Sequence, residues 1–137
     1  MPVNNRRDLS QSELSTTLIL FEEHALVRAA LAQNLQMQPD IQLLQVSPYL
    51  PSRPETILSL NPEVILIGLP QHSVANIQTL AGHVKVWANA GIAVIVSTPY
   101  LKAEEEKLLF EGGIFAYILK TIDAERLSTI ISTAKAF

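Results

Sequence analysis

Short unbroken runs of apolar residues recur along the chain, and in the stretches between them apolar residues fall three or four positions apart. Unbroken runs are typical of strands buried on both faces of a parallel sheet, and the spacing of three and four is typical of amphipathic helices. The runs predict five strands, over residues 17–21, 41–46, 64–67, 92–96 and 115–119. The spacing predicts five helices, over residues 24–37, 54–60, 74–90, 102–111 and 123–137.

The alternation of strands and helices predicts an α/β protein of the flavodoxin-like (βα)5 type, a doubly wound three-layer sandwich. A parallel sheet in the order 2-1-3-4-5 fits, because the first, third and fourth runs are the most apolar ones. The second run carries two glutamines, which suits an edge strand. Residues 17–137 are predicted to form this domain, and the polar, unpatterned residues 1–16 are predicted to be a flexible arm.

For two of the predicted helices the sequence indicates which residues face the sheet and which face outward. The helix over 24–37 is expected to turn Leu26, Ala30 and Leu35 toward the sheet. The last helix is expected to leave four small uncharged side chains on its outer face, namely Ser128, Thr129, Ser132 and Thr133. Uncharged helix faces are covered at less cost than charged ones, so this helix is predicted to carry a contact surface for a second copy or another protein.

Composition and charge narrow the class of protein. The 137 residues are 48% hydrophobic and 17% charged, which suits one domain with a buried core. Cysteine is absent, and His24, His72 and His83 lack the spacing of a zinc site. The formal net charge is −3, and no arginines cluster apart from Arg6 and Arg7, so this segment is not expected to bind nucleic acid directly. No apolar run approaches the roughly 20 residues of a membrane span, and a secretory signal is not evident, so a cytoplasmic protein is expected.

The predicted sheet order also places the candidate site. In an open parallel sheet the functional groups lie just beyond the carboxyl ends of the strands. That edge brings together Glu22, Glu23, Gly68, Thr98 and Lys120. Gly68, which ends the most central run, supplies no nucleophile, base or metal ligand, so the site is not expected to work through a side chain at its centre.

Four stretches in order, LILFEEHALVRAAL, NPEVILIGLP, VIVSTPY and FAYILK, resemble the receiver domain of two-component response regulators. The resemblance is greatest to the subgroup in which the receiver precedes a helix-turn-helix domain of the NarL/LuxR type, and it spans about Thr17 to Lys135. In that family a paired acid binds magnesium, an aspartate accepts a phosphoryl group, and a threonine or serine and a lysine contact that group. The resemblance implies these positions at, in turn, Glu22 with Glu23, Gly68, Thr98 and Lys120, and an aromatic switch at Tyr117.

The chain departs from this family pattern in two places. Glycine stands at the acceptor position, and the only aspartates, Asp8, Asp40 and Asp123, do not end a central strand. His72 follows four residues after Gly68 and is expected to be an exposed loop residue. Thr121 follows Lys120 where the family usually has a proline after a cis bond, so a trans bond and a reshaped loop are expected.

Each of the remaining positions also has a simple structural interpretation. Lys120 is expected to neutralise Glu22 and Glu23 as an ion pair, because adjacent carboxylates in a pocket need a cation. A magnesium site made of those two glutamates alone would be weak, since that ion demands tight octahedral geometry. Thr98 either caps the next loop or keeps a switch role, and Tyr117 either covers the sheet edge or moves as a switch.

Two functional hypotheses follow. The first is a pseudo-receiver, not an enzyme, that signals without phosphorylation in transcriptional or two-component-type regulation. Its partner would be another protein or a second copy, met by the last helix or by the face of the fourth helix, fifth strand and fifth helix. The alternative is a flavodoxin-like domain that binds a small ligand or acts as an enzyme, although a glycine-rich phosphate loop and a nucleophile–base pair are not evident in the sequence.

Overall fold

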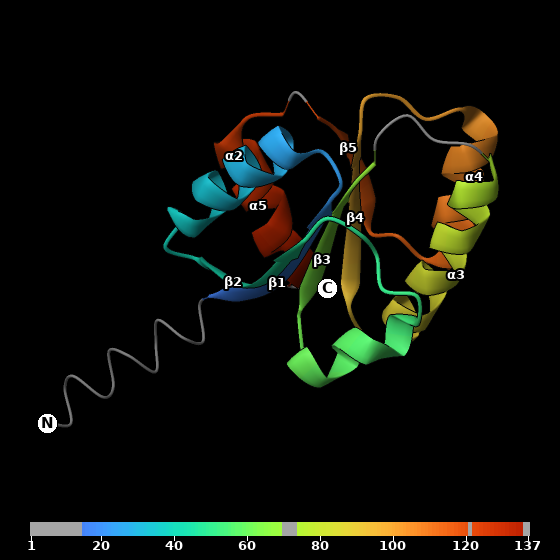
Figure 1. Cartoon of the computed structure of the whole chain (residues 1–137), viewed down its shortest axis with the longest axis horizontal. Helices are drawn as coiled ribbons and strands as arrows, with labels where there is room; N and C mark the ends of the chain where they lie inside the picture. The colour runs from blue at the N-terminus through green and yellow to red at the C-terminus, as the bar shows by residue number, and fades with distance from the viewer. Residues whose placement is uncertain (1–14, 70–73, 121, 136–137) are drawn as a thin grey trace, which may run out of the picture.

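The computed structural model describes residues 15–69, 74–120 and 122–135, with only the backbone of residues 74–76. Strands and helices alternate along the chain (Figure 1). The elements are β1 (Thr16–Glu22), α2 (Ala25–Gln36), β2 (Ile41–Ser47), η1 (Pro54–Leu60), β3 (Val64–Gly68), α3 (Val74–Asn89), β4 (Ala93–Thr98), α4 (Ala103–Gly112), β5 (Ala116–Leu119) and α5 (Ala124–Lys135). None of the described helices is both long and apolar enough to cross a membrane. All but the last two residues of the predicted N-terminal arm lie outside the described residues.

The five strands form one parallel sheet in the order β2-β1-β3-β4-β5, which confirms the predicted fold class and strand order. The third strand is central, and its residues Val64 to Ile67 are at most 1% exposed, as an unbroken apolar run predicts. In the register of β1 and β3, Glu22 lies beside Gly68. The carboxyl ends of the central strands therefore meet at one edge of the sheet.

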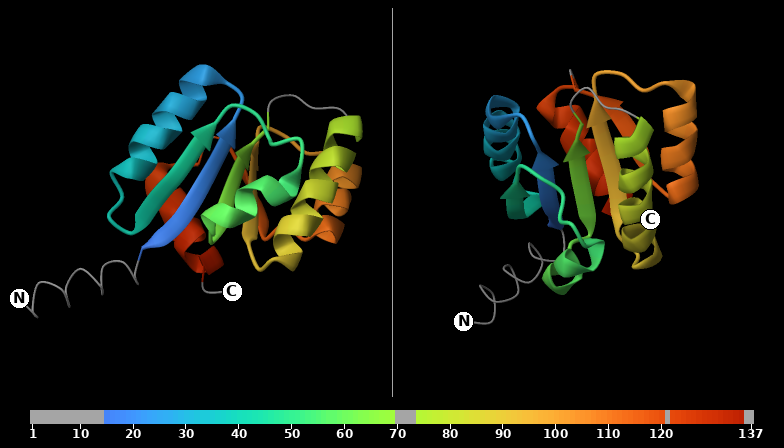
Figure 2. Two further views of the ribbon diagram at one scale, coloured as in Figure 1. Left: turned by 60° about the horizontal axis from the view of Figure 1, so that its bottom comes forward. Right: turned by 45° about the vertical axis from the view of Figure 1, so that its right-hand side comes forward.

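Helices cover both faces of the sheet, with α2 and α5 on one face and η1, α3 and α4 on the other (Figures 1 and 2). Because successive strand residues point to opposite faces, each strand serves two cores. Leu18 and Leu66 pack in the core that also contains Ile131 of α5. Ile19 and Ile67 pack in the core on the α3 side.

The connection between β2 and η1 is held by two side chains of α3. The indole Nε1–H of Trp87 donates to the carbonyl oxygen of Pro54 at 2.8 Å, and the imidazole Nε2 of His83 lies 2.7 Å from the carbonyl oxygen of Pro51. Trp87 is fully buried and stacks on Phe21 at the end of β1, with ring centroids 6.1 Å apart. The proline-rich segment before η1 is therefore fixed against α3. The predicted short helix from Pro54 is a 3-10 helix.

The first helix is rotated relative to the prediction. Leu35 faces the core as expected, but Leu26 is 77% exposed and Ala30 is exposed as well. The guanidinium Nη1 of Arg28 donates to the carbonyl oxygens of Glu22 and Glu23, at 3.0 and 3.2 Å, so Arg28 is turned back toward β1 instead of outward. That pair of hydrogen bonds sets the rotation of the first turn and leaves Leu26 in solvent.

The prediction for the outer face of α5 is wrong for two of its four residues. Ser128 is buried, and its hydroxyl and that of Ser132 donate to the carboxylate of Asp40, the latter at 3.0 Å. Small polar residues can be buried where a hydrogen-bond acceptor, here the Asp40 carboxylate, is within reach. Thr129 and Thr133 are exposed as expected, and each hydroxyl donates to the carbonyl four residues earlier. The last two residues of the predicted helix lie outside the described residues.

Candidate functional site

A buried ion pair crosses the carboxyl edge of the sheet. The ammonium Nζ of Lys120, just after β5, lies 3.0 Å from Glu22 Oε1 at the end of β1. The Glu22 side chain is fully buried, and 19% of the Lys120 side chain is exposed. The other carboxylate oxygen, Oε2, accepts a hydrogen bond from the backbone N–H of His24 at 3.0 Å. Since β3 and β4 lie between β1 and β5, the pair spans the ends of both central strands.

The first strand was predicted to end at residue 21, but it includes Glu22 as its last residue, and that side chain is 0% exposed. A carboxylate can be buried there because an opposite charge and a backbone donor compensate it.

Gly68 leaves the room that the Glu22 carboxylate occupies. A Cβ atom built on Gly68 would overlap Glu22 Oε1 and would lie 2.6 Å from Glu22 Cδ. Real Cβ atoms do not approach other heavy atoms so closely. The absence of a side chain at position 68 therefore provides the space in which the Glu22 carboxylate lies.

The hydroxyl of Thr98 is engaged within its own loop. Oγ1 donates to the carbonyl oxygen of Tyr100 at 3.0 Å and accepts from the Tyr100 N–H at 3.3 Å, and Thr98 is 0% exposed. These contacts agree with the interpretation of Thr98 as a loop cap. Ser97, which the sequence analysis did not single out, is buried and lies beside Gly68 in the register of β3 and β4. The fourth strand was predicted to end at residue 96, one residue before Ser97, whereas β4 continues to Thr98.

Glu23 does not share the ion pair that was predicted for it. Its side chain is exposed and has no ion pair among the described residues, so Lys120 neutralises Glu22 alone. With Glu22 bound to Lys120 and no carboxylate at Gly68, Glu23 is the free carboxylate among the positions that the resemblance assigned to the metal and the acceptor. Within the described chain, no three carboxylate, histidine or cysteine side chains group as metal ligands do. These residues do not fit magnesium, which the receiver family holds at this edge and which needs several oxygen ligands in octahedral geometry.

Tyr117 lies at the edge strand and contacts α4. Its ring meets Phe110 edge to face, with centroids 6.3 Å apart, and its hydroxyl donates to Glu106 Oε2 at 3.3 Å. The nearby Glu106 carboxylate raises the pKa of Tyr117 above its usual 10.0, with smaller contributions from desolvation and from the hydrogen bond itself. The ring is half-buried, as expected of a residue that covers the sheet edge.

Two predictions concern residues outside the described part of the chain. They are the exposure of His72 and the geometry of the bond between Lys120 and Thr121, and both stay predictions.

Besides a cavity of about 550 Å³ beside the start of α5, two cavities lined by described residues flank the sheet at opposite edges. The larger, about 970 Å³, lies at the amino ends of the strands, away from the candidate site. Its two charged lining residues, Glu63 and Lys135, pair with each other at 3.6 Å, and Glu63 also accepts hydrogen bonds from Thr17. The smaller, about 240 Å³, lies at the carboxyl edge and is lined in part by Gly68 and Glu23. The candidate site belongs to the smaller cavity, because parallel sheets present their functional groups at that edge.

Comparison with known proteins agrees with this fold. No protein-family model matches the chain. The transcriptional regulatory protein LiaR of Bacillus subtilis is 26% identical over 117 residues, which are 85% of this chain and 54% of LiaR, so the chain spans about half the length of that relative.

Solved structures of response regulators superpose well on the chain. A LuxR-family DNA-binding response regulator from Staphylococcus aureus gives a TM-score of 0.72 at 22% identity, over 88% of this chain and 98% of that one. The receiver domain of a NarL response regulator from Mycobacterium tuberculosis gives 0.72 at 13% identity, over 90% and 98%. The chain therefore has the fold of response regulator receiver domains.

The overlap between position 68 and Glu22 makes a direct prediction for stability. Gly68→Ala should destabilise the protein by about 1–3 kcal/mol, because the added methyl forces the buried carboxylate off Lys120. In a Glu22→Ala background the same substitution should cost less, with a coupling energy of about 0.5–3 kcal/mol. Urea unfolding of the two single variants and the double variant measures this.

Gly82→Ala is the matched control for the added methyl. A Cβ at Gly82 meets nothing within 4 Å, and the residue is exposed in α3. This variant should gain roughly 0.5–1 kcal/mol from helix propensity alone. Additive costs for Gly68→Ala and Glu22→Ala would contradict the shared-space argument.

The contact between Tyr117 and Glu106 makes a prediction for pH dependence. Glu106→Gln should lower the pKa of Tyr117 toward 10.0, because it removes the charge that opposes phenolate formation. A raised pKa in the folded state means that this contribution to stability is complete below pH about 10 and is lost as pH rises through the folded pKa. NMR titration of labelled tyrosine rings measures the shift. Glu104→Gln, an exposed change in the same helix, should leave it unaltered, and an unchanged Tyr117 titration in Glu106→Gln would refute the assignment.

Proposed function

We propose that this chain is a pseudo-receiver, a non-enzymatic signalling domain that acts through protein contacts and does not accept a phosphoryl group. The observation that carries the proposal is the Glu22 carboxylate, which fills the side-chain space of Gly68 and binds Lys120. In receivers that position belongs to the acceptor aspartate, and the lysine contacts the phosphoryl group. Here both the space and the lysine are already used.

The setting of the proposed activity follows from the relatives. LiaR is a transcriptional regulatory protein and the Staphylococcus aureus protein is a DNA-binding response regulator. By likeness to them, we place this chain in transcriptional or two-component-type regulation, in the cytoplasm. Residues 17–137 would form the signalling domain and residues 1–16 an arm. Direct contact with nucleic acid is not part of the proposal for this segment, whose formal net charge is −3.

A small-ligand or enzymatic role on the same fold is less well supported. The cavity at the carboxyl edge holds about 240 Å³. Sites for drug-sized ligands and cofactors enclose about 300–1,000 Å³, so a flavin or nucleotide would not be enclosed here.

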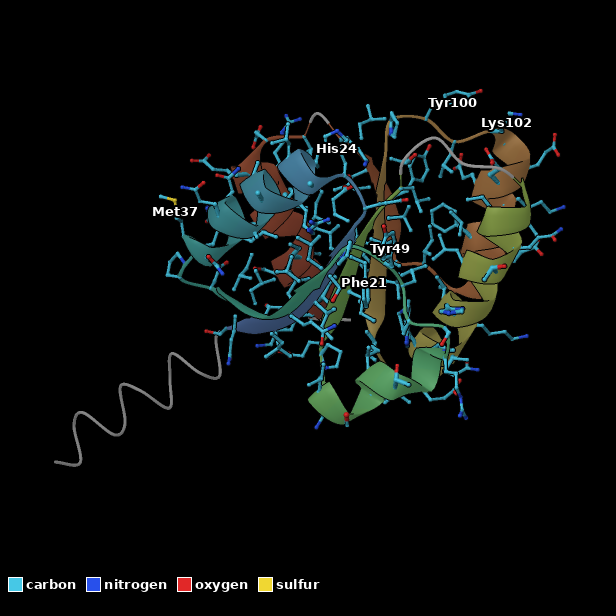
Figure 3. All side chains as sticks on the ribbon, in the orientation of Figure 1. Phe21, His24, Met37, Tyr49, Tyr100 and Lys102 are labelled. Atoms are coloured by element: carbon cyan, nitrogen blue, oxygen red, sulfur yellow. The ribbon has the colours of Figure 1, made fainter. Side chains whose placement is uncertain are left out.

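A surface for protein contact lies on α4 and β5. Tyr117 and Leu119 are two residues apart in β5, so their side chains lie on the same face of the sheet. Phe110 of α4 packs on Tyr117, and both Phe110 and Leu119 are large apolar residues with about half their surface in solvent, at 45% and 54%. Tyr100, 66% exposed, belongs to the loop that leads into α4 (Figure 3). Exposed apolar groups that adjoin one another favour an interface, which we assign to a second copy of the chain.

The absence of an acceptor predicts that phosphoryl donors leave the protein unchanged. Incubation with acetyl phosphate and Mg²⁺ should add no phosphoryl group, because the carboxylate that would take it is replaced by Gly68. Intact mass measured under conditions that preserve acyl phosphates is the readout, with a conventional receiver as the positive control. A stoichiometric acid-labile adduct would overturn the proposal.

Gly68→Asp sharpens this experiment. The new side chain would meet the Glu22 carboxylate both sterically and as a like charge, so the variant should be less stable and should still phosphorylate poorly. Efficient phosphorylation of this single variant would mean that only the acceptor had been lost from an otherwise working site.

The apolar surface on α4 and β5 predicts reversible self-association. The wild type should form dimers at tens of micromolar, and Leu119→Glu should shift the equilibrium to monomer, because it places a charge in the contact. Sedimentation velocity over a concentration series measures this. Leu60→Glu, a change at a similarly exposed leucine of η1, should have no effect. A wild type that stays monomeric throughout would remove the assignment of this face to a second copy.

A further inference from the structure

The cavity of about 240 Å³ at the carboxyl edge, here called the edge pocket, has an apolar interior and one charged lining residue. Its apolar lining residues come from the ends of β1 and β3, from the segment after β2 and from α3. They are Phe21, Pro48, Tyr49, Leu50, Ile67, Leu69 and Leu80, and the remaining lining residues are Gly68, Thr79 and Glu23. Tyr49 and Phe21 are labelled in Figure 3, where they lie near each other in front of the sheet.

One wall of the edge pocket is fixed in place. Pro48, Tyr49 and Leu50 form that wall, and the backbone that follows them is held by α3 at Pro51 and Pro54 through His83 and Trp87, as described above. The stacking of Trp87 on Phe21 ties the same helix to the opposite wall. A pocket with fixed walls costs little ordering free energy when it is filled, which favours binding.

The exposed residues at the edge pocket combine apolar surface with negative charge. Tyr49 is 69% exposed, which leaves a large aromatic ring in solvent beside an apolar hollow. Glu23 is exposed and has no ion pair among the described residues, whereas its neighbour Glu22 is neutralised by Lys120. The Glu23 carboxylate is therefore open to a positive group of a partner.

We infer that the edge pocket anchors one apolar side chain of a partner protein, with a basic residue of that partner set against Glu23. The size of the pocket supports a single side chain, because a cavity of about 150 Å³ already holds benzene, while enclosed ligand sites begin at about 300 Å³. Interface energy commonly concentrates in such pockets, and charge complementarity at the rim sets specificity. This inference rests on the proposed function, because it assigns one contact of the proposed protein-binding domain to the carboxyl edge of the sheet.

Blocked tripeptides test the inference on the chain of 137 residues. ¹⁵N-labelled protein is titrated at millimolar concentrations with acetyl-Arg-Leu-Arg-amide, acetyl-Glu-Leu-Glu-amide and acetyl-Arg-Ser-Arg-amide. The first should give saturable amide shifts centred on Phe21, Glu23, Leu50 and Leu80. The serine peptide should bind at least about tenfold more weakly, because it lacks the apolar anchor. The acidic peptide should bind about two- to fivefold more weakly than the arginine peptide, because its carboxylates repel Glu23.

Variants separate the apolar and charged parts of the pocket. Leu50→Trp should fill the pocket and abolish the shifts, whereas Leu60→Trp, the same change at an exposed leucine of η1, should leave them intact. Glu23→Gln should weaken the arginine peptide about two- to fivefold, and Glu104→Gln in α4 should not. Because Glu23→Gln keeps the size of an exposed side chain, it tests the inference even where Leu50→Trp disturbs the fold.

The outcomes divide cleanly. Saturable binding with both preferences, lost in Leu50→Trp and weakened in Glu23→Gln, supports the inference. Absence of shifts, shifts centred elsewhere, or equal binding of the three peptides overturns it. The titration measures binding at the edge pocket alone. It can therefore give a negative result while the phosphoryl experiment supports the proposed function. Conversely, a phosphoryl adduct can overturn the proposed function while the pocket still binds the peptide.

Discussion

The ion pair between Glu22 and Lys120 is the constraint on which the carboxyl edge of this protein depends. A fully buried carboxylate is costly unless a charge and hydrogen-bond donors compensate it, and removal of one partner of such a pair costs more than the pair itself contributes. Lys120 supplies the charge from beyond β5, and the N–H of His24 supplies a donor from the start of α2. Because the carboxylate lies where a side chain at position 68 would be, the observed position of Glu22 leaves no room for a Cβ atom there unless the glutamate moves. Three positions on three strand ends thus depend on one another.

The described side chains at the carboxyl edge, where receiver domains bind the phosphoryl group, are engaged with one another. A site that transfers a phosphoryl group needs a free acceptor, a bound metal and a lysine that can engage the product. In this chain the lysine holds Glu22, Thr98 bonds within its own loop, and Glu23 is exposed without an ion pair among the described residues. The same edge carries the small apolar edge pocket, with the Glu23 carboxylate among its lining residues. Such features suit recognition by another protein better than catalysis.

The fold could be predicted from the sequence because it depends on local patterns, whereas the site depends on contacts between distant residues. Val64 to Ile67 form an unbroken apolar run because both faces of their strand are covered, and that pattern survives in the sequence alone. The pairing of Glu22 with Lys120, 98 residues away, could be predicted because the strand order brings both to one edge, but the sequence did not show that Glu22 alone takes part and that Glu23 stays in solvent. Ser128 was expected in solvent, because its acceptor Asp40 lies 88 residues earlier. Sequence periodicity reports burial on average, and it misplaces polar residues whose burial is compensated from elsewhere.

The length of the Glu22 side chain explains why the acid pair of this chain does not behave as two equivalent groups. Glutamate has one methylene more than aspartate, and at the end of β1 this length carries the carboxylate over the neighbouring strand to the position beside Gly68. Glu23, one residue later and beyond the end of β1, is exposed and lines the edge pocket instead. The two acids that resemble a metal site in sequence therefore have different surroundings, because one pairs with Lys120 inside the protein and the other faces solvent at the edge pocket.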